Sequence, residues 1–292
     1  MLGYKEFKEM VKRELQRVLG ENYLVVEEDV VKNNGIEMEA LAVLKKKDNV
    51  APLVYVSELY EHYKMGAALE DIVEQVAETM NVHVSIDAQV LEQDFWDIHD
   101  EIYMTLVNKE LNKKKLETVV TRDFLDLAVI FNIRLHSTDY ETCSCTITKQ
   151  LLKNWGITEE VLCTVAWKNL QKEQAVIRNI MSVIAGEEVE ILELYEEKML
   201  HILSNRENVH GAVMMMRKEL LHSFADRFEK NLYVLPSSIH ECLLLVDNGQ
   251  HDAYGLKQMV QEINQSVVDA KEVLSESVYY YDREMGEVRK LC

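Results

Sequence analysis

The stretch that most constrains the fold runs from Asn231 to Gly249 and reads Asn-Leu-Tyr-Val-Leu-Pro-Ser-Ser-Ile-His-Glu-Cys-Leu-Leu-Leu-Val-Asp-Asn-Gly. Two strongly apolar runs, Leu232–Leu235 and Glu241–Val246, flank one of the chain's 2 prolines. Short apolar runs bounded by turn residues are typical of buried strands. We therefore expect two core strands joined by a Pro-Ser-Ser corner, in which Pro236 fixes φ and the serine hydroxyls bond nearby backbone.

The same corner holds the residues that could carry chemistry, namely Pro236, Ser237, Ser238, His240 and Glu241. A hydrolase would use Ser238 or Ser237 as nucleophile and His240 as base, with an acid from elsewhere, because side chains at neighbouring positions of an extended segment point to opposite faces. Two other hypotheses stay open. The corner could be a surface that binds a ligand or a partner protein, or a purely structural element with no site.

Established catalytic signatures are absent from the sequence. It contains no Gly-rich phosphate loop, no Gly-x-Gly-x-x-Gly, no His-Glu-x-x-His and no Gly-x-Ser-x-Gly. The acids and histidine Asp94, Asp97, His99 and Asp100 match no metal-ligand spacing, and Cys143 and Cys145 are too close together for a zinc knuckle. We therefore expect no metal and no cofactor.

Charge and cysteine content restrict the partners and the compartment. The 292 residues include 51 acids and 32 bases, giving a net charge of -19, which disfavours nucleic acid or an anionic membrane as a partner. Five cysteines, an odd number, suit reduced thiols. No apolar stretch has the length of a signal peptide core or a spanning helix. We expect an acidic cytoplasmic protein that binds an unknown protein or small molecule.

Helical and extended patterns alternate irregularly along the chain. Amphipathic spacing predicts helices over 4–19, 58–64, 68–80, 108–116, 149–155, 158–174, 189–198, 218–230 and 252–264. Apolar runs, alternation and turn residues predict strands over 23–31, 36–44, 53–56, 82–86, 102–107, 124–135, 142–148, 200–203, 211–216, 232–235, 241–246, 278–281 and 287–291.

This mixture of elements favours an α+β fold with mixed or antiparallel sheets and packed amphipathic helices over a doubly wound parallel sheet. The composition shifts near Trp155 to Thr158, so we expect an N-terminal α+β half over residues 1–156 and a C-terminal half over 157–292 that carries the Pro-Ser-Ser-Ile-His-Glu motif. No flexible linker marks this division.

The run Leu232-Tyr-Val-Leu-Pro-Ser-Ser-Ile-His-Glu241 resembles the hallmark of an uncharacterised family, a domain of unknown function found mainly in clostridial, gut-type bacteria. Further stretches resemble it in the same order: Leu53 to Tyr60 with Gly66, Leu106 to Asn112, Phe124 to Val129, Trp155 to Glu160, and Ile202 to Asn205 with Gly211-Ala212. The sequence departs from the family pattern at Val119-Val120, where a proline is expected, and at Cys242, where an aliphatic residue is expected.

The resemblance implies a bacterial cytoplasmic α+β protein and brings no catalytic residues. Our first hypothesis is therefore a non-enzymatic module that binds a protein or a ligand, with Pro236 to Glu241 at or near the surface used. It rests on a compact polar motif between two apolar strands, since loops on rigid scaffolds often carry function. The hydrolase and the purely structural readings remain the alternatives.

Overall fold

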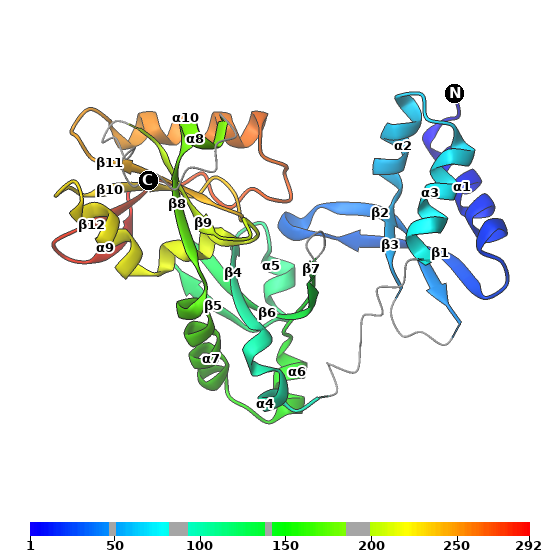
Figure 1. Ribbon diagram of the computed structural model, residues 1–292, viewed down its shortest axis with the longest axis horizontal. Helices are drawn as coiled ribbons and strands as arrows, with labels where there is room; N and C mark the ends of the chain where they lie inside the picture. Colours follow the sequence, from blue (N-terminus) through cyan, green and yellow to red (C-terminus); the bar gives the residue numbers. More distant parts are fainter. Residues whose placement is uncertain (47–50, 82–92, 138–141, 185–198) are drawn as a thin grey trace. The chain divides into compact units, whose positions relative to one another are not determined.

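The computed structural model describes residues 1–46, 51–81, 93–137, 142–184 and 199–292. It divides into two compact units, an N-terminal unit of Met1–Glu92 and a C-terminal unit of Gln93–Cys292. Both combine helices with antiparallel sheets, which confirms the α+β fold (Figure 1). The extended segment expected at 82–86 and the helix expected at 189–198 lie outside the described residues.

The N-terminal unit is a three-stranded sheet with helices on one face (Figure 1). Its elements are α1 (Tyr4–Leu19), β1 (Tyr23–Val31), η1 (Asn33–Gly35), β2 (Glu37–Lys45), β3 (Leu53–Tyr55), α2 (Val56–Lys64) and α3 (Leu69–Asn81). The apolar stripe of α1, with Phe7, Val11 and Leu15 fully buried, packs on Val25 and Leu41 of the sheet. This is the pattern expected when the stripe of an amphipathic helix covers a sheet face.

The first part of the C-terminal unit is a four-stranded sheet in which β6 is central. Its elements are α4 (Phe95–Ile98), η3 (His99–Glu101), β4 (Ile102–Asn108), α5 (Lys113–Leu116), β5 (Thr121–Phe124), β6 (Leu127–Ser137) and β7 (Thr142–Thr146). Strands β4, β5 and β7 each pair with β6 in antiparallel register. The predicted pairing of residues 124–135 with the 142–148 strand is thereby confirmed.

The strand expected over 124–135 is confirmed as β6 from Leu127 onward, whereas its first residues belong to the turn of a hairpin with β5. Strand β5 ends at Phe124 and β6 begins at Leu127, because Leu125 adopts a left-handed backbone with φ 54°. Asp126 lies in this turn between β5 and β6. Its carboxylate accepts hydrogen bonds from Ser277 Oγ at 2.6 Å, Lys290 Nζ at 2.8 Å and the Tyr279 hydroxyl. Asp126 therefore connects this sheet to the C-terminal end of the chain.

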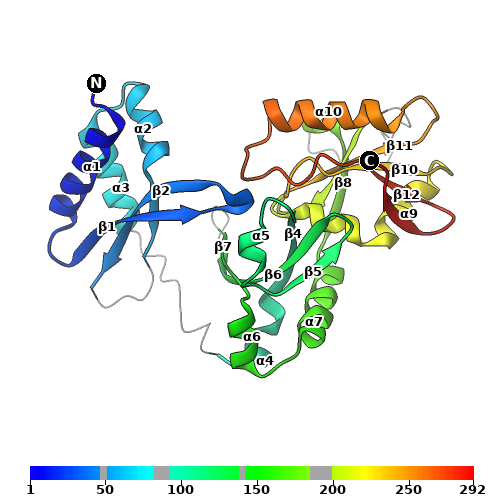
Figure 2. The ribbon, with the colours of Figure 1, turned by 180° about the vertical axis from the view of Figure 1, so that it is seen from behind.

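The rest of the C-terminal unit is built on a six-stranded sheet, in the order β13-β12-β10-β11-β9-β8. The elements are α6 (Lys149–Trp155), α7 (Glu159–Lys172), β8 (Ala175–Asn179), α8 (Ile180–Ile184), β9 (His201–Asn205), η4 (Gly211–Met216), α9 (Lys218–Asp226), β10 (Leu232–Leu235), β11 (Cys242–Val246), α10 (Ala253–Ser266), β12 (Tyr279–Asp282) and β13 (Glu287–Lys290). Figures 1 and 2 show α10 lying across one face of this sheet, where Leu256 and Val260 pack against Tyr233 and Leu245.

The predicted strands of the opening stretch are confirmed as β10 and β11, which pair directly with Leu235 opposite Leu243. Both strands are buried along their whole length. The predicted caps are also confirmed: Thr158 Oγ1 accepts from Val161 N at 3.3 Å and Asp252 Oδ1 from Gly255 N at 2.9 Å. The strand expected over 211–216 is wrong, since these residues form the 3₁₀ helix η4.

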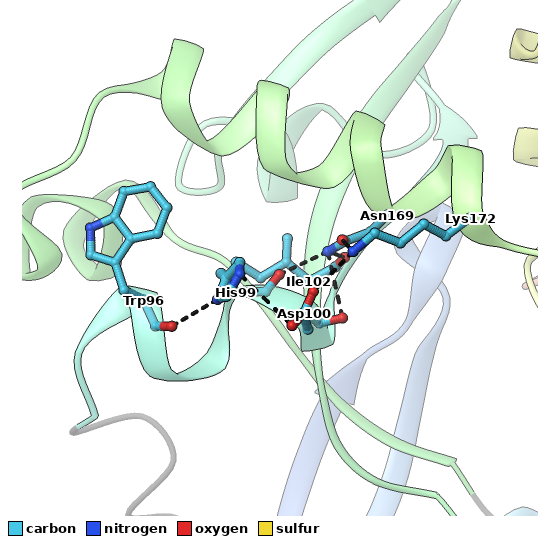
Figure 3. A network of polar contacts seen from close by, with 6 residues as sticks. All are labelled: Trp96, His99, Asp100, Ile102, Asn169 and Lys172. Carbon is cyan, nitrogen blue, oxygen red and sulfur yellow. Dashed lines mark hydrogen bonds and ion pairs between the residues drawn. The ribbon is translucent and has the colours of Figure 1, made fainter.

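The division expected between residues 156 and 157 falls inside the C-terminal unit. Within this unit, helix α7 is hydrogen-bonded to η3 and to the start of β4 (Figure 3). Asn169 Nδ2 donates to the backbone oxygens of His99 at 2.8 Å and Ile102 at 2.9 Å. Lys172 Nζ donates to Asp100 Oδ1 at 3.1 Å. A helix that follows the expected boundary is thus bonded to a strand that precedes it.

Replacing Asp126 by Asn should destabilise the C-terminal unit by about 1–3 kcal/mol, because three donors lose a charged acceptor in a half-buried position. Burial opposes ionisation, but the hydrogen bonds from Lys290, Ser277 and Tyr279 outweigh it and hold the pKa of Asp126 below its usual range. The stabilisation is therefore present above pH 4 and is lost as the pH falls below it.

The measurement is urea unfolding followed by tryptophan fluorescence, since Trp96, Trp155 and Trp167 all lie in the C-terminal unit. The exposed Asp97→Asn is the matched control and should change the stability by less than about 0.5 kcal/mol. Equal stability of the Asp126 variant and the control would contradict the role given to Asp126.

Candidate functional site

Most of the predicted site residues are buried in the connection between β10 and β11, which we call the junction. Pro236, Ser237 and Ser238 are all buried, and only His240 and Glu241 reach the surface in part. Ser238 Oγ accepts hydrogen bonds from the backbone N–H groups of His240 at 3.1 Å and Glu241 at 3.3 Å. This is the serine turn that the sequence predicts for the Pro-Ser-Ser corner.

The backbone of the corner is hydrogen-bonded on both sides. On one side Ser275 N donates to Pro236 O at 3.2 Å, and Ile239 N donates to Glu272 O at 2.9 Å. On the other side Ala212 N donates to Ile239 O at 3.3 Å. The corner therefore joins the segment before β12 to the start of η4.

His240 is held by contacts at both ring nitrogens. Its Nδ1 accepts a hydrogen bond from the backbone N–H of His210 at 3.2 Å, and its Nε2 lies 3.7 Å from Glu272 Oε1. The acceptor role of Nδ1 places the proton of the neutral ring on Nε2, facing Glu272. Among the described residues, no hydrogen bond joins the imidazole to a serine hydroxyl, which weighs against His240 as the base for Ser238.

His210 stacks directly on His240 and was not identified from the sequence. The two ring centroids are 5.5 Å apart with planes 10° apart. His210 also stacks on Tyr103 of β4, with ring centroids 6.3 Å apart, and the Arg134 guanidinium of β6 lies 5.4 Å from the Tyr103 ring. Arg134, Tyr103, His210 and His240 thus form one continuous stack, which we call the histidine stack, linking the two sheets of the C-terminal unit.

The loop that carries His210 is held in a strained backbone conformation. Asn208 and His210 both have a left-handed backbone, with φ values of 53° and 55°. Such non-glycine residues cost free energy and persist only where the surroundings fix them. Asn205, which is buried, provides much of this fixation: its Nδ2 donates to Val209 O at 2.8 Å and its Oδ1 accepts from Val209 N at 3.1 Å.

Gly211 follows this loop at a point of close approach. A Cβ there would lie 2.2 Å from Ser204 Oγ and 2.7 Å from His240 O, distances that no side chain tolerates. Ser204 Oγ itself donates to His240 O at 2.8 Å. A glycine is therefore required where the loop passes the end of the Pro-Ser-Ser-Ile-His-Glu motif.

Charged groups surround a water-sized cavity beside the stack. The cavity has a volume of about 10 Å³ and is lined by Tyr103, Arg134, Glu173, Glu207 and His210 together with the apolar residues Met104, Val209 and Val213. Such a volume admits about one water molecule. Burial raises the pKa of Glu173, although its Oε1 accepts a hydrogen bond from Asn205 Nδ2 at 2.7 Å.

Burial also shifts the titration of the groups near the stack. It lowers the pKa of His210 to about 4, assisted by the charge of His240. It raises the pKa of Glu241, against the opposing effect of His240 and Arg178. His210 is therefore neutral at physiological pH.

Two negative findings concern the described part of the chain. It contains no group of three or more His, Cys, Asp or Glu side chains placed to hold a metal ion. Over the same residues, none of the helices combines the length and the apolarity needed to cross a bilayer.

The comparisons with known proteins give one positive result. A family of unknown function, DUF5688, has a model that matches residues 4–283. The chain belongs to this family. The match extends over both compact units. Comparison with curated proteins and with solved structures gave no match.

Gly211→Ala should destabilise the C-terminal unit by at least about 2 kcal/mol, because the added methyl group overlaps Ser204 and the His240 carbonyl. The control is Gly255→Ala in α10, where the nearest atom is 3.3 Å away, and it should change the stability by less than about 1 kcal/mol. Urea unfolding measures both. A Gly211 variant as stable as the Gly255 variant would refute the close approach.

His210 should make the stability depend on pH in a defined direction. Its pKa falls from 6.5 to about 4 on folding, so the unfolded chain binds more protons between these values. Stability is full above pH 6.5 and should fall by on the order of 1–2 kcal/mol by pH 5. His210→Asn, which suits a left-handed backbone and does not titrate, should lose this part of the pH dependence. Identical pH profiles for the two proteins would contradict the assignment.

Proposed function

We propose that this DUF5688 protein is a non-enzymatic bacterial cytoplasmic protein that binds a partner protein. The proposed contact surface consists of the exposed loop 206–208 with His240 and Glu241 at its side. The observation that carries the proposal is the rigid, strained loop, since exposed polar side chains on a fixed backbone form recognition surfaces without an ordering cost on binding.

The chemistry of this surface suits a protein better than a small molecule. Pockets for small molecules typically enclose a few hundred Å³ or more, whereas the cavity beside the histidine stack holds about one water. The exposed groups are of mixed charge, with Arg206, Glu207 and Asn208 in the loop and Glu241 beside Arg178. A polar, complementary surface of a partner protein fits such a pattern.

The hydrolase alternative has less support. Ser238 Oγ already accepts two backbone hydrogen bonds, and the two ring nitrogens of His240 face His210 and Glu272. The purely structural alternative agrees with the buried Pro236–Ser238 segment, and it differs from the proposal only at the exposed loop. The decisive experiment must therefore change the loop and leave the junction intact.

Glu207→Lys should reduce partner binding about tenfold or more, because it reverses a charge at the centre of the proposed surface, where Glu207 lies 3.9 Å from Arg134. The experiment is quantitative affinity purification of the full-length protein from its native host, with mass spectrometry of the bound proteins. Glu262→Lys, an equal charge change on the exposed side of α10, is the control and should retain them.

If Glu207→Lys and wild type retain the same proteins in the same amounts, this surface is not the binding surface. Circular dichroism and thermal melting of both variants exclude a loss of folding as the cause. A Ser238→Ala variant with lower stability and normal binding would agree with the proposal, since Ser238 only supports the corner.

A further inference from the structure

The N-terminal unit has an open sheet edge. In the order β1-β2-β3, β1 is an edge strand, and it pairs along its whole length with β2, from Tyr23 opposite Lys45 to Val31 opposite Glu37. An edge strand presents backbone N–H and C=O groups that a further strand can bond.

The register identifies which residues point outward. Lys32 N donates to Ile36 O at 2.7 Å and Lys46 N to Asn22 O at 2.8 Å, so the even-numbered residues of β1 bond to β2. In an antiparallel pair the alternate residues then direct their backbone groups to the free edge. Gln16 of α1 confirms this, because its amide donates to Tyr23 O at 3.0 Å and accepts from Val25 N at 3.0 Å.

Gln16 therefore bonds outward backbone groups of Tyr23 and Val25 in the first part of the edge. The rest of the edge can accept a further strand. Beyond Val25, the outward residues are Glu27, Asp29 and Val31, and no described residue bonds their backbone N–H groups. All three are exposed, with Val31 at 63%. The open edge is thus the segment Glu27–Val31.

A groove lies along α1 and reaches β1 at Val25. It has a volume of about 690 Å³ and is lined by residues that include Lys5, Glu9, Met10, Arg13 and Val25. On the opposite face of the sheet Leu24 is 54% exposed. A strand added at the edge would place alternate side chains on the helix side, where Asp29 lies, and on the opposite face beside Leu24.

The charge at the edge limits what can bind there. Glu27 is neutralised by Lys8 and Lys12 of α1 at 3.3 and 2.6 Å. Among the described residues, no cation pairs with the exposed Glu28 or Asp29. Two copies of β1 paired antiparallel would set these acids against each other, and like charges directly opposite are destabilising. A second copy of this chain is therefore disfavoured, and a basic segment is favoured.

We propose that the open edge of β1 binds an extended segment of a partner polypeptide as a fourth strand, and that this segment alternates lysine or arginine with apolar residues. Its backbone bonds the outward groups of Glu27, Asp29 and Val31. Its basic side chains pair with Asp29 on the helix side of the sheet, while its apolar side chains lie beside Leu24 on the opposite face. This surface is separate from the one proposed above for the C-terminal unit, and the two proposals are tested independently.

The probe is a capped nine-residue peptide of alternating valine and lysine, added to the full-length protein. Hydrogen exchange followed by mass spectrometry should show slower exchange over residues 25–31, and fluorescence anisotropy of the labelled peptide should give saturable binding. The matching valine–glutamate peptide should do neither, because its acids would lie on the same face as Asp29.

Asp29→Pro is the decisive variant. The N–H of residue 29 points outward, so proline removes an edge donor and leaves the bonds to β2 in place. It should weaken peptide binding at least tenfold. Asp29→Asn keeps the N–H and removes the charge, so it should show a smaller loss and a weaker dependence on salt. Circular dichroism checks that both variants fold.

Three results would overturn the proposal. The first is unchanged exchange over residues 25–31 at saturating valine–lysine peptide. The second is equal binding by Asp29→Pro, which retains the folded hairpin and lacks the edge donor. The third is self-association of the wild-type protein that Asp29→Pro abolishes, which would assign the edge to a second copy of this chain.

Discussion

The C-terminal unit depends on one short segment whose backbone is bonded on both sides. Ile239 donates to Glu272 O and accepts from Ala212 N, so a single residue between β10 and β11 joins the chain before β12 to the start of η4. Because the segment is buried, breaking these bonds would leave polar backbone groups without water. The Pro-Ser-Ser-Ile-His-Glu motif is conformationally fixed by this requirement, and Ser238 satisfies two further N–H groups within it.

The histidine stack extends the same junction to the other sheet. His240 follows Ile239 directly, and His210 stacks both on His240 and on Tyr103 of β4. The stack fixes the exposed loop in a backbone that Asn208 and His210 would not adopt alone. We therefore propose partner binding for the exposed loop 206–208, which the motif supports, and not for the buried Ser237 and Ser238.

Much of the fold could be predicted from local sequence signals. Helix caps such as Thr158 and Asp252, and the apolar runs of β10 and β11, have an unambiguous physical meaning over a few residues. The errors arose where the local sequence carries no signal for the structure that forms. The apolar run Gly211–Met216 suits a strand, yet it forms a 3₁₀ helix whose first residue, Gly211, lies close to the backbone oxygen of His240. Leu125 in a left-handed turn likewise carries no turn signal.

The candidate site was only partly predictable for a related reason. His240 and Glu241 were identified, whereas Tyr103, Arg134 and His210 come from distant parts of the chain and meet only through the pairing of strands. One signal was available: Asn208 and His210 precede Gly211, and Asn and His tolerate a left-handed backbone better than most residues.

The most direct test of the central claim is native-state hydrogen exchange of individual amides in the C-terminal unit. If the junction organises this unit, the N–H groups of Ile239, Ala212 and His210 should exchange only through its global unfolding, as slowly as those of the buried strands β10 and β11. Exchange of these three amides at the rate of exposed loops, with β10 and β11 still protected, would show that the junction opens independently and would contradict the account.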